Sequence, residues 1–225
     1  MTDATPEPDV PPESKRILDP LERISEVIFG VIMALSFTGS LSVASAGRAE
    51  VRTMLVGALG CNTAWGIVDG VMYVLGNLLL RNRNWLQLMA VRRAADPEVG
   101  RRILARGLPG SIGLHLQREE LERLRSKIVS DPMVPVRHVV TGEDLLGAAG
   151  IFLLCFISTL PVALPFAIIQ HPVYALRTSN LVAMGLLFLA GHRLGRFAGF
   201  AAWRFGFVML GIGVVLVLVT LALGG

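Results

Sequence analysis

The chain has 225 residues, of which 53% are hydrophobic and only 17% charged, and its formal net charge is +4. Soluble domains carry charges on about a quarter of their residues. Here the charges lie in clusters, separated by apolar runs long enough to cross a bilayer core of about 30 Å. The composition therefore excludes an ordinary soluble domain and predicts an integral membrane protein in contact with the lipid bilayer.

The N-terminal third predicts a tail and two membrane spans. Residues 1–22 are acidic and Pro-rich and lack the apolar core of a signal peptide, so we expect a disordered tail. Residues 23–80 hold two apolar runs, at 24–46 and 53–80, and each is long enough for a transmembrane helix. Gly66 and Gly70 in the second run would allow close approach of a neighbouring helix.

The polar block 81–143 predicts a helical insert. Asp96 is a suitable N-cap and Pro97 suits the first position of a helix. A second helix is expected over residues 112–130, where apolar residues recur with the helical period. Thr141 then caps the helix that follows, with Glu143 and Asp144 in its first turn.

Residues 144–225 predict three further spans, so the expected fold is an all-α membrane protein with five transmembrane helices and an insert between spans two and three. These spans are expected at 144–169, 179–192 with an extension toward Phe197, and 205–223. Pro161 and Pro165 should kink or end the first of them.

The basic residues predict the orientation. With a cytoplasmic N-terminus, 18 of the 21 Lys and Arg residues fall on the cytoplasmic side, as the positive-inside rule requires. The C-terminus then lies on the opposite side and the insert is cytoplasmic. This placement accounts for the net positive charge, and no basic patch interleaved with aromatic residues indicates nucleic-acid binding.

Asp69 is the strongest candidate for a functional residue, because it is the sole charge between Arg52 and Arg81. A carboxylate inside a membrane helix is costly and commonly serves ion or proton movement. Asn62 and Met72 share its helix face and could add ligands for a cation. The alternative is a buried Asp that forms hydrogen bonds in a static bundle.

Two weaker candidates have plain structural alternatives. Glu26 lies near the start of the first span and could be a membrane ligand or an interfacial anchor. In the insert, His115, Glu119 and Glu122 would share one helix face and could bind a divalent ion, but a solvated face with an ion pair between Glu119 and Arg123 is the simpler explanation. Cys61 and Cys155 both read as small buried hydrophobes.

No enzyme is indicated, because no nucleophile elbow, phosphate-binding loop or zinc-ligand spacing is present. No tightly bound cofactor is expected either.

The order of these segments resembles the vacuolar iron transporter family. The stretches "SEVIFGVIMAL", "LVGALGCNTAWGIVDGVMYVL" and "LLGAAGIFLLCFISTLPVALPFAII" are similar in style to its first three spans, and the glycine-rich C-terminus to its last. The resemblance implies a homodimer that moves Fe²⁺ or a similar divalent cation in exchange for protons. Glu26, Asp69 and Met72 are the nearest matches to its membrane ligands. The insert departs from the family, since it holds twelve basic and seven acidic residues.

Two functions are therefore expected from the sequence. The first is a proton-coupled divalent-metal transporter that exports Fe²⁺ or Mn²⁺ from the cytoplasm. The alternative is a non-transporting accessory subunit of the same fold, whose basic insert binds a partner protein or anionic lipid.

Overall fold

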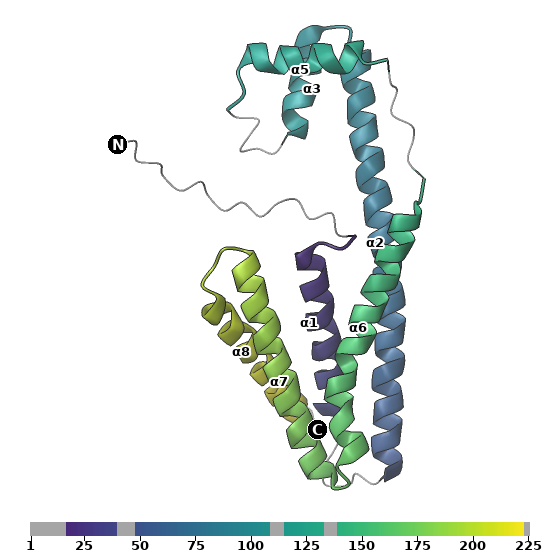
Figure 1. Ribbon diagram of the computed structural model, residues 1–225, viewed down its shortest axis with the longest axis vertical. Coiled ribbons are helices and arrows are strands. Elements are labelled where there is room, and N and C mark those ends of the chain that lie inside the picture. Colours follow the sequence, from purple (N-terminus) through teal and green to yellow (C-terminus); the bar gives the residue numbers. More distant parts are fainter. Residues whose placement is uncertain (1–16, 40–47, 109–114, 133–138, 223–225) are drawn as a thin grey trace, which may run out of the picture. The chain divides into compact units, whose positions relative to one another are not determined.

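The computed structural model describes residues 17–39, 48–108, 115–132 and 139–222, and all regular structure in these ranges is helical (Figure 1). Seven helices occur there: α1 (Pro20–Gly39), α2 (Arg48–Arg93), α3 (Pro97–Gly107), α5 (Arg118–Ser130), α6 (Gly142–Ile168), α7 (Pro172–Phe197) and α8 (Ala202–Ala222). The all-helical prediction is confirmed. Most of the predicted N-terminal tail, residues 1–16, and the end of the first predicted span, residues 40–46, lie outside the described residues.

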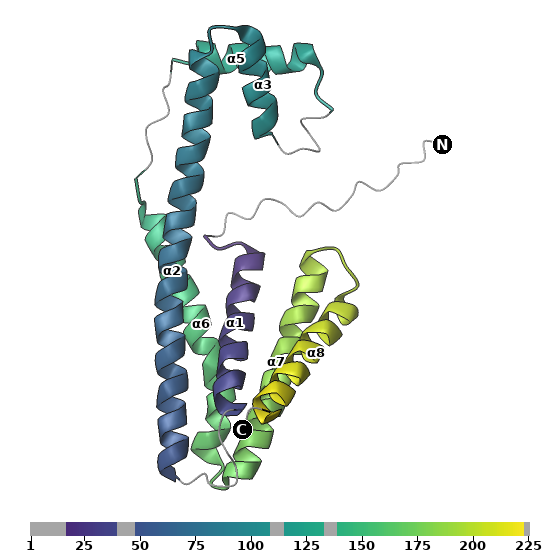
Figure 2. The same ribbon diagram turned by 180° about the vertical axis from the view of Figure 1, so that it is seen from behind.

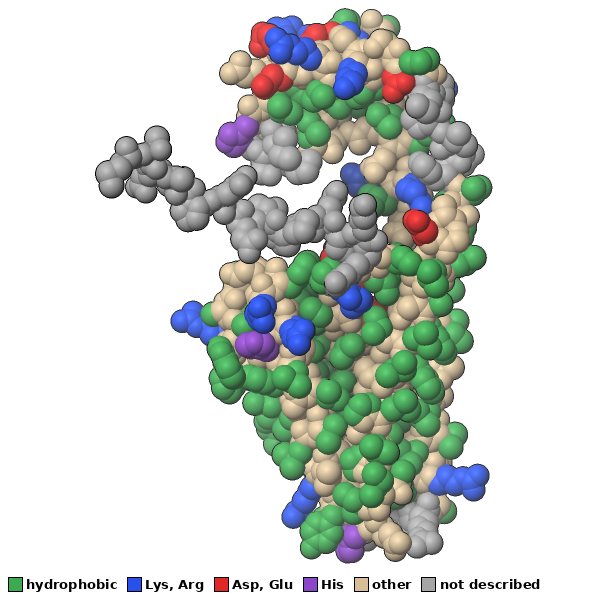
Figure 3. All heavy atoms as spheres, viewed as in Figure 1, with side chains coloured by type: hydrophobic (Ala, Val, Ile, Leu, Met, Phe, Trp, Pro, Cys, Tyr) green, Lys and Arg blue, Asp and Glu red, His purple; other side chains and the backbone are tan. Residues whose placement is uncertain are grey.

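Four helices are long and apolar enough to cross a membrane, namely α2, α6, α7 and α8. This supports the membrane class. The described part of α1 is 20 residues long and includes Glu22, Arg23 and Glu26, so its role as a fifth span stays a prediction. In Figure 3, hydrophobic side chains cover much of the visible face in the lower half of the view, where most of the long apolar helices lie.

The chain divides into two compact units. The first contains the described residues of Met1–Val71 and Leu146–Gly225, and the second those of Met72–Leu145. In the first unit, α1 lies between α6 and α7 in both views (Figures 1 and 2). The core between these three helices is apolar and fully buried, and it is formed by Val31, Ala34, Leu35, Val162, Ala183 and Leu187.

Helices α7 and α8 form a tight hairpin because glycines remove side chains from their interface. A Cβ at Gly191 would lie 2.6 Å from the carbonyl oxygen of Phe205, and one at Gly195 would lie 2.9 Å from the Cα of Ala202. Such small-residue contacts are typical of helices that associate in a bilayer.

The second unit consists of the C-terminal part of α2 with α3, α5 and the first turn of α6. As predicted, Asp96 caps α3, and its side chain accepts a hydrogen bond from the backbone N–H of Glu98 at 2.8 Å. Gln87 of α2 donates to the carbonyl of Ile103 at 3.1 Å, which ties α3 to α2. Thr141 caps α6 as predicted, and its hydroxyl accepts from the N–H of Asp144 at 3.3 Å.

Several helix bounds differ from the prediction. Helix α2 does not end near Leu80 but continues to Arg93, because no Gly or Pro interrupts the polar stretch that follows the apolar run. The predicted insert helix starts at Arg118 rather than at residue 112. Gln117 is extended, and its N–H donates to the Glu120 carboxylate at 2.8 Å, which sets the start of α5.

Two of the last three predicted spans also differ from the prediction. Helix α6 runs through Pro161 and Pro165 to Ile168, so neither proline ends it. Helix α7 begins at Pro172, earlier than the predicted residue 179, because proline is favoured at the first position of a helix.

Candidate metal site

Three helices of the first unit approach one another closely where α6 passes α1 and α2. A Cβ at Gly30 of α1 would overlap with the Ser158 hydroxyl and lie 2.5 Å from the carbonyl oxygen of Cys155. On α2, a Cβ at Gly66 would lie 3.0 Å from the Phe152 ring, and one at Gly70 3.1 Å from the Ala148 carbonyl oxygen. The prediction that Gly66 and Gly70 permit close approach of a neighbouring helix is confirmed.

This close packing brings together three groups that could bind a metal ion. Glu26 of α1, Asp69 of α2 and Cys155 of α6 each offer one ligand atom, and these atoms lie within 4.8 Å of one another. Bonds of about 2.0–2.3 Å from one zinc-like ion place its ligands roughly 3–4.5 Å apart. The observed separations are therefore close to those that one ion requires.

The group lies inside the helix bundle and its polar atoms are incompletely satisfied. Glu26 is 9% exposed and Cys155 is 0% exposed, whereas Asp69 is half-buried. The Oε2 atom of Glu26 is buried and has no hydrogen-bond partner among the described residues. A buried carboxylate without a partner is costly, so this position favours a proton or a cation beside Glu26.

Asn62 completes the surroundings of the group. It is 0% exposed, and the thiol of Cys155 donates to its backbone carbonyl at 3.8 Å and to its Oδ1 at 3.9 Å. Within the described chain, its Nδ2 is buried without an acceptor. Asn62 thus adds an amide with unused hydrogen-bonding capacity at the edge of the group.

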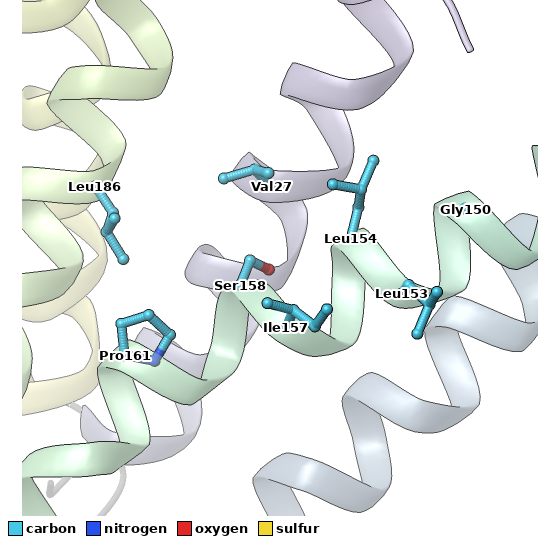
Figure 4. Close-up of a pocket in the computed structure, with 8 residues that line it drawn as sticks. All are labelled: Val27, Gly150, Leu153, Leu154, Ile157, Ser158, Pro161 and Leu186. Atoms are coloured by element: carbon cyan, nitrogen blue, oxygen red, sulfur yellow. The ribbon is translucent and has the colours of Figure 1, made fainter. Parts of the chain in front are cut away.

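An apolar cavity of about 430 Å³ lies beside this region, between α1, α6 and α7 (Figure 4). The residues that line it are Val27, Gly150, Leu153, Leu154, Ile157, Ser158, Pro161 and Leu186. The Ser158 hydroxyl, the polar side-chain group in this lining, donates to the Cys155 carbonyl at 2.8 Å. With its polar group already bonded, the cavity is unsuited to a hydrated ion and suits an acyl chain or another apolar group.

The sequence-predicted residues of α1 and α2 meet only in part. Glu26 and Asp69, both predicted as membrane ligands, lie in one group. Met72, three residues after Asp69 on α2, belongs to the second compact unit and its side chain is 60% exposed. The sequence predicts an inert buried residue at Cys155, whereas the structure places its sulfur beside two carboxylates.

The predicted insert trio is not arranged as expected. His115 lies in a turn before α5, so the three residues do not share one helix face, and Glu119 is exposed. Glu122 accepts hydrogen bonds from Arg101 at 2.6 Å and from Arg125 at 2.6 Å. These arginines, with Arg125 contributing most, lower the pKa of Glu122 to about 2. A metal ion at Glu122 would have to compete with both arginines for the carboxylate oxygens.

No protein-family model matches the sequence, and no curated protein shows significant similarity to it.

Proposed function

We propose that this protein carries divalent metal cations of the Fe²⁺ or Mn²⁺ class across a membrane in exchange for protons. The observation that carries the proposal is the group of Glu26, Asp69 and Cys155, whose ligand atoms lie within 4.8 Å of one another in an apolar helical unit. Oxygen ligands suit Mn²⁺ and Fe²⁺. Among the described residues, the buried Oε2 atom of Glu26 has no hydrogen-bond partner. A bound ion or proton would be favourable at this atom.

Charge balance explains why protons would be exchanged. A net charge buried among apolar helices is strongly unfavourable. With Glu26 and Asp69 both protonated the pair is neutral, and with both ionised around one divalent cation it is neutral again. Each ion bound would then release two protons, and the same two groups would serve as ligands and as proton carriers.

The proposal includes the topology predicted from the sequence: α1 supplies a first span ahead of α2, α6, α7 and α8, residues 81–143 form a cytoplasmic insert, and the C-terminus lies opposite the N-terminus. It also includes a homodimer, as in the vacuolar iron transporter family that the sequence resembles. Trp65, Val68 and Val71 on α2 are exposed apolar side chains. Their exposure supports the proposal that lipid or a second copy of the chain covers this face of α2.

The test is uptake of Mn²⁺ and Fe²⁺ into proteoliposomes that contain the purified full-length protein and a pH-sensitive dye. We expect uptake with proton movement in the opposite direction, and Asp69→Asn should abolish both. Glu143→Gln is the matched control, because Glu143 is an exposed acid in the first turn of α6. Uptake that survives Asp69→Asn would refute the assigned role, and no uptake by the wild type would refute the function.

A second candidate is a non-transporting membrane subunit, and the insert favours it. Glu98 and Glu122 are engaged by Arg101, Arg118 and Arg125, so two of its few acids are already used within the fold. The insert as a whole still holds more basic than acidic residues, a balance suited to an acidic partner or anionic lipid. Co-sedimentation of the detergent-solubilised full-length protein with anionic, but not neutral, vesicles together with absence of metal uptake would favour this candidate.

A further inference from the structure

Cys155 has surroundings that an inert cysteine does not need. Its side chain is fully buried, and its sulfur belongs to the same group of ligand atoms as Glu26 and Asp69. A small buried hydrophobe packs against other apolar groups, whereas this thiol lies beside two acidic side chains and the amide of Asn62. The thiolate, rather than the thiol, is a strong metal ligand.

The position of the sulfur is fixed by its own helix and by α1. Ser158 donates to the Cys155 carbonyl at 2.8 Å, and the same carbonyl lies where a Cβ at Gly30 would come within 2.5 Å. Glycine at position 30 therefore lets α6 bring Cys155 up to the α1 backbone, near Glu26. The three ligand atoms come from three different helices, so the bundle must be assembled for the group to exist.

The side-chain amide of Asn62 can form a hydrogen bond with Cys155 whether the sulfur is a thiol or a thiolate. Its Oδ1 accepts from the neutral thiol at 3.9 Å. A half-turn of the amide exchanges Oδ1 with Nδ2, which has no acceptor in the described part of the chain, and an N–H would then point toward a thiolate. Loss of the thiol proton therefore does not have to leave the sulfur without a donor.

We propose that Cys155 is a third metal ligand and that it makes this site prefer thiophilic divalent ions, such as Cd²⁺ and Zn²⁺, over Mn²⁺. The inference rests on the proposed transport function and names the substrate class of that site. Soft sulfur ligands bind Zn²⁺ and its heavier congener Cd²⁺ strongly, and carboxylates suit Mn²⁺. Its second support is the Glu26 carboxylate, which is nine-tenths buried with one oxygen unpartnered among the described residues.

Charge balance limits how the three groups act together. Neutrality around a divalent ion requires two of the three groups to lose a proton. With Mn²⁺ the two carboxylates ionise and the thiol keeps its proton. With Cd²⁺ the thiol and one carboxyl group lose theirs, and the other carboxyl group stays protonated. Two protons leave for each ion in both cases.

The first test compares Cd²⁺ and Mn²⁺ uptake by wild-type protein and Cys155→Ser in proteoliposomes. We expect Cd²⁺ uptake at low concentration to fall roughly ten- to hundredfold, the range typical of a weakened metal site, while Mn²⁺ uptake changes little. Cys61→Ser is the matched control, because Cys61 is a free, half-buried cysteine on α2 outside the group, and it should leave both uptakes unchanged. Equal effects of Cys155→Ser on both ions would overturn the inference.

The second test needs no change at Cys155. X-ray absorption at the cadmium edge, on full-length Cys61→Ser protein loaded with Cd²⁺, should show one sulfur neighbour together with oxygen neighbours. A shell of oxygen alone would overturn the inference even if Cys155→Ser fails to fold. These outcomes are distinct from failure of the proposed function, in which wild-type protein takes up neither Mn²⁺ nor Fe²⁺.

Discussion

Glu26 of α1 and Asp69 of α2 present carboxylate oxygens within 4.8 Å of each other, although the two residues lie on separate helices. Two like charges at this separation repel each other strongly in a poorly solvated place. Protonation therefore stabilises the pair, and under the proposed function a bound cation would stabilise it in the same way. A change in the charge of either residue should therefore change the stability of the protein, which thermal unfolding can measure.

Glu26→Gln should stabilise the metal-free protein and remove its response to metal. The neutral amide needs no proton to avoid repulsion with Asp69, so the free energy that the wild type spends on protonating Glu26 is saved, and we expect a gain on the order of 1 kcal/mol at neutral pH. Thermal unfolding in detergent measures this. Wild-type protein should melt higher with added Mn²⁺, because a ligand that binds the folded state stabilises it, and the variant should show no such shift. A variant that melts lower without metal would show that the carboxylate is structurally required.

Gly30→Ala should destabilise the bundle and weaken the site. The added Cβ would overlap with the Ser158 hydroxyl and lie 2.5 Å from the Cys155 carbonyl oxygen, so α1 and α6 must separate. Overpacking of this kind costs about 1–3 kcal/mol. Gly185→Ala is the control, since a Cβ there meets nothing within 4 Å. Thermal unfolding and the Mn²⁺-induced shift report the two effects, and equal behaviour of the variants would contradict the packing argument.

Acid should loosen the contact between α3 and α5. The pKa of Glu122 is lowered from its ordinary 4.5 to about 2, first by Arg125 and then by Arg101. A carboxylate with a lowered pKa stabilises the fold above its ordinary value, and the contribution is lost as the pH falls from about 4.5 toward 2. Hydrogen exchange of α5 in the intact protein should therefore speed up across this range, beyond the intrinsic pH effect.

Glu122→Gln should remove most of this acid dependence and raise α5 exchange at neutral pH. Glu119→Gln serves as the control, because Glu119 is an exposed acid on the same helix. A group whose pKa is raised on folding would show the opposite pH dependence, with its stabilising contribution lost as the pH rises. Protection of α5 that stays constant down to pH 2 in wild-type protein would contradict the role of the Glu122 contacts.

The long apolar helices and two members of the candidate site, Glu26 and Asp69, could be identified from the sequence for the same energetic reason. Apolar runs of about twenty residues have few alternatives to a membrane helix, and an acid within such a run is costly wherever it lies. Glu26 and Asp69 are conspicuous on that ground. Cys155 is not, because a cysteine in an apolar run is inexpensive and its neighbours on other helices depend on how the helices pack.

The helix bounds and pairings that differ from the prediction depend on local polar contacts. The start of α5 is set by the Gln117 N–H and the Glu120 carboxylate, and an earlier start is equally compatible with the apolar spacing. Pairing across the insert, such as Arg101 with Glu122, joins residues on separate helices. A periodic pattern on one helix contains no information about such a partner, so it could not show that Glu122 binds an arginine rather than a metal.

Arg81→Gln should destabilise the protein through Asp144, a pairing that the sequence did not reveal. Asp144 is buried in the first turn of α6 and is bonded to Arg81, Asn77 and Thr141. Removal of the guanidinium leaves a buried carboxylate with neutral donors alone, which is far less favourable than the pair. We expect the melting temperature in detergent to fall by several degrees, and the control Arg83→Gln, at an exposed arginine two residues away, to change it little.

Because an amide at position 144 would carry no charge, adding Asp144→Asn to Arg81→Gln should recover part of the loss. A double variant that melts lower than Arg81→Gln alone would mean that the carboxylate acts mainly as the cap of α6, through its bond with the Thr141 N–H at 2.8 Å, rather than as the partner of the arginine.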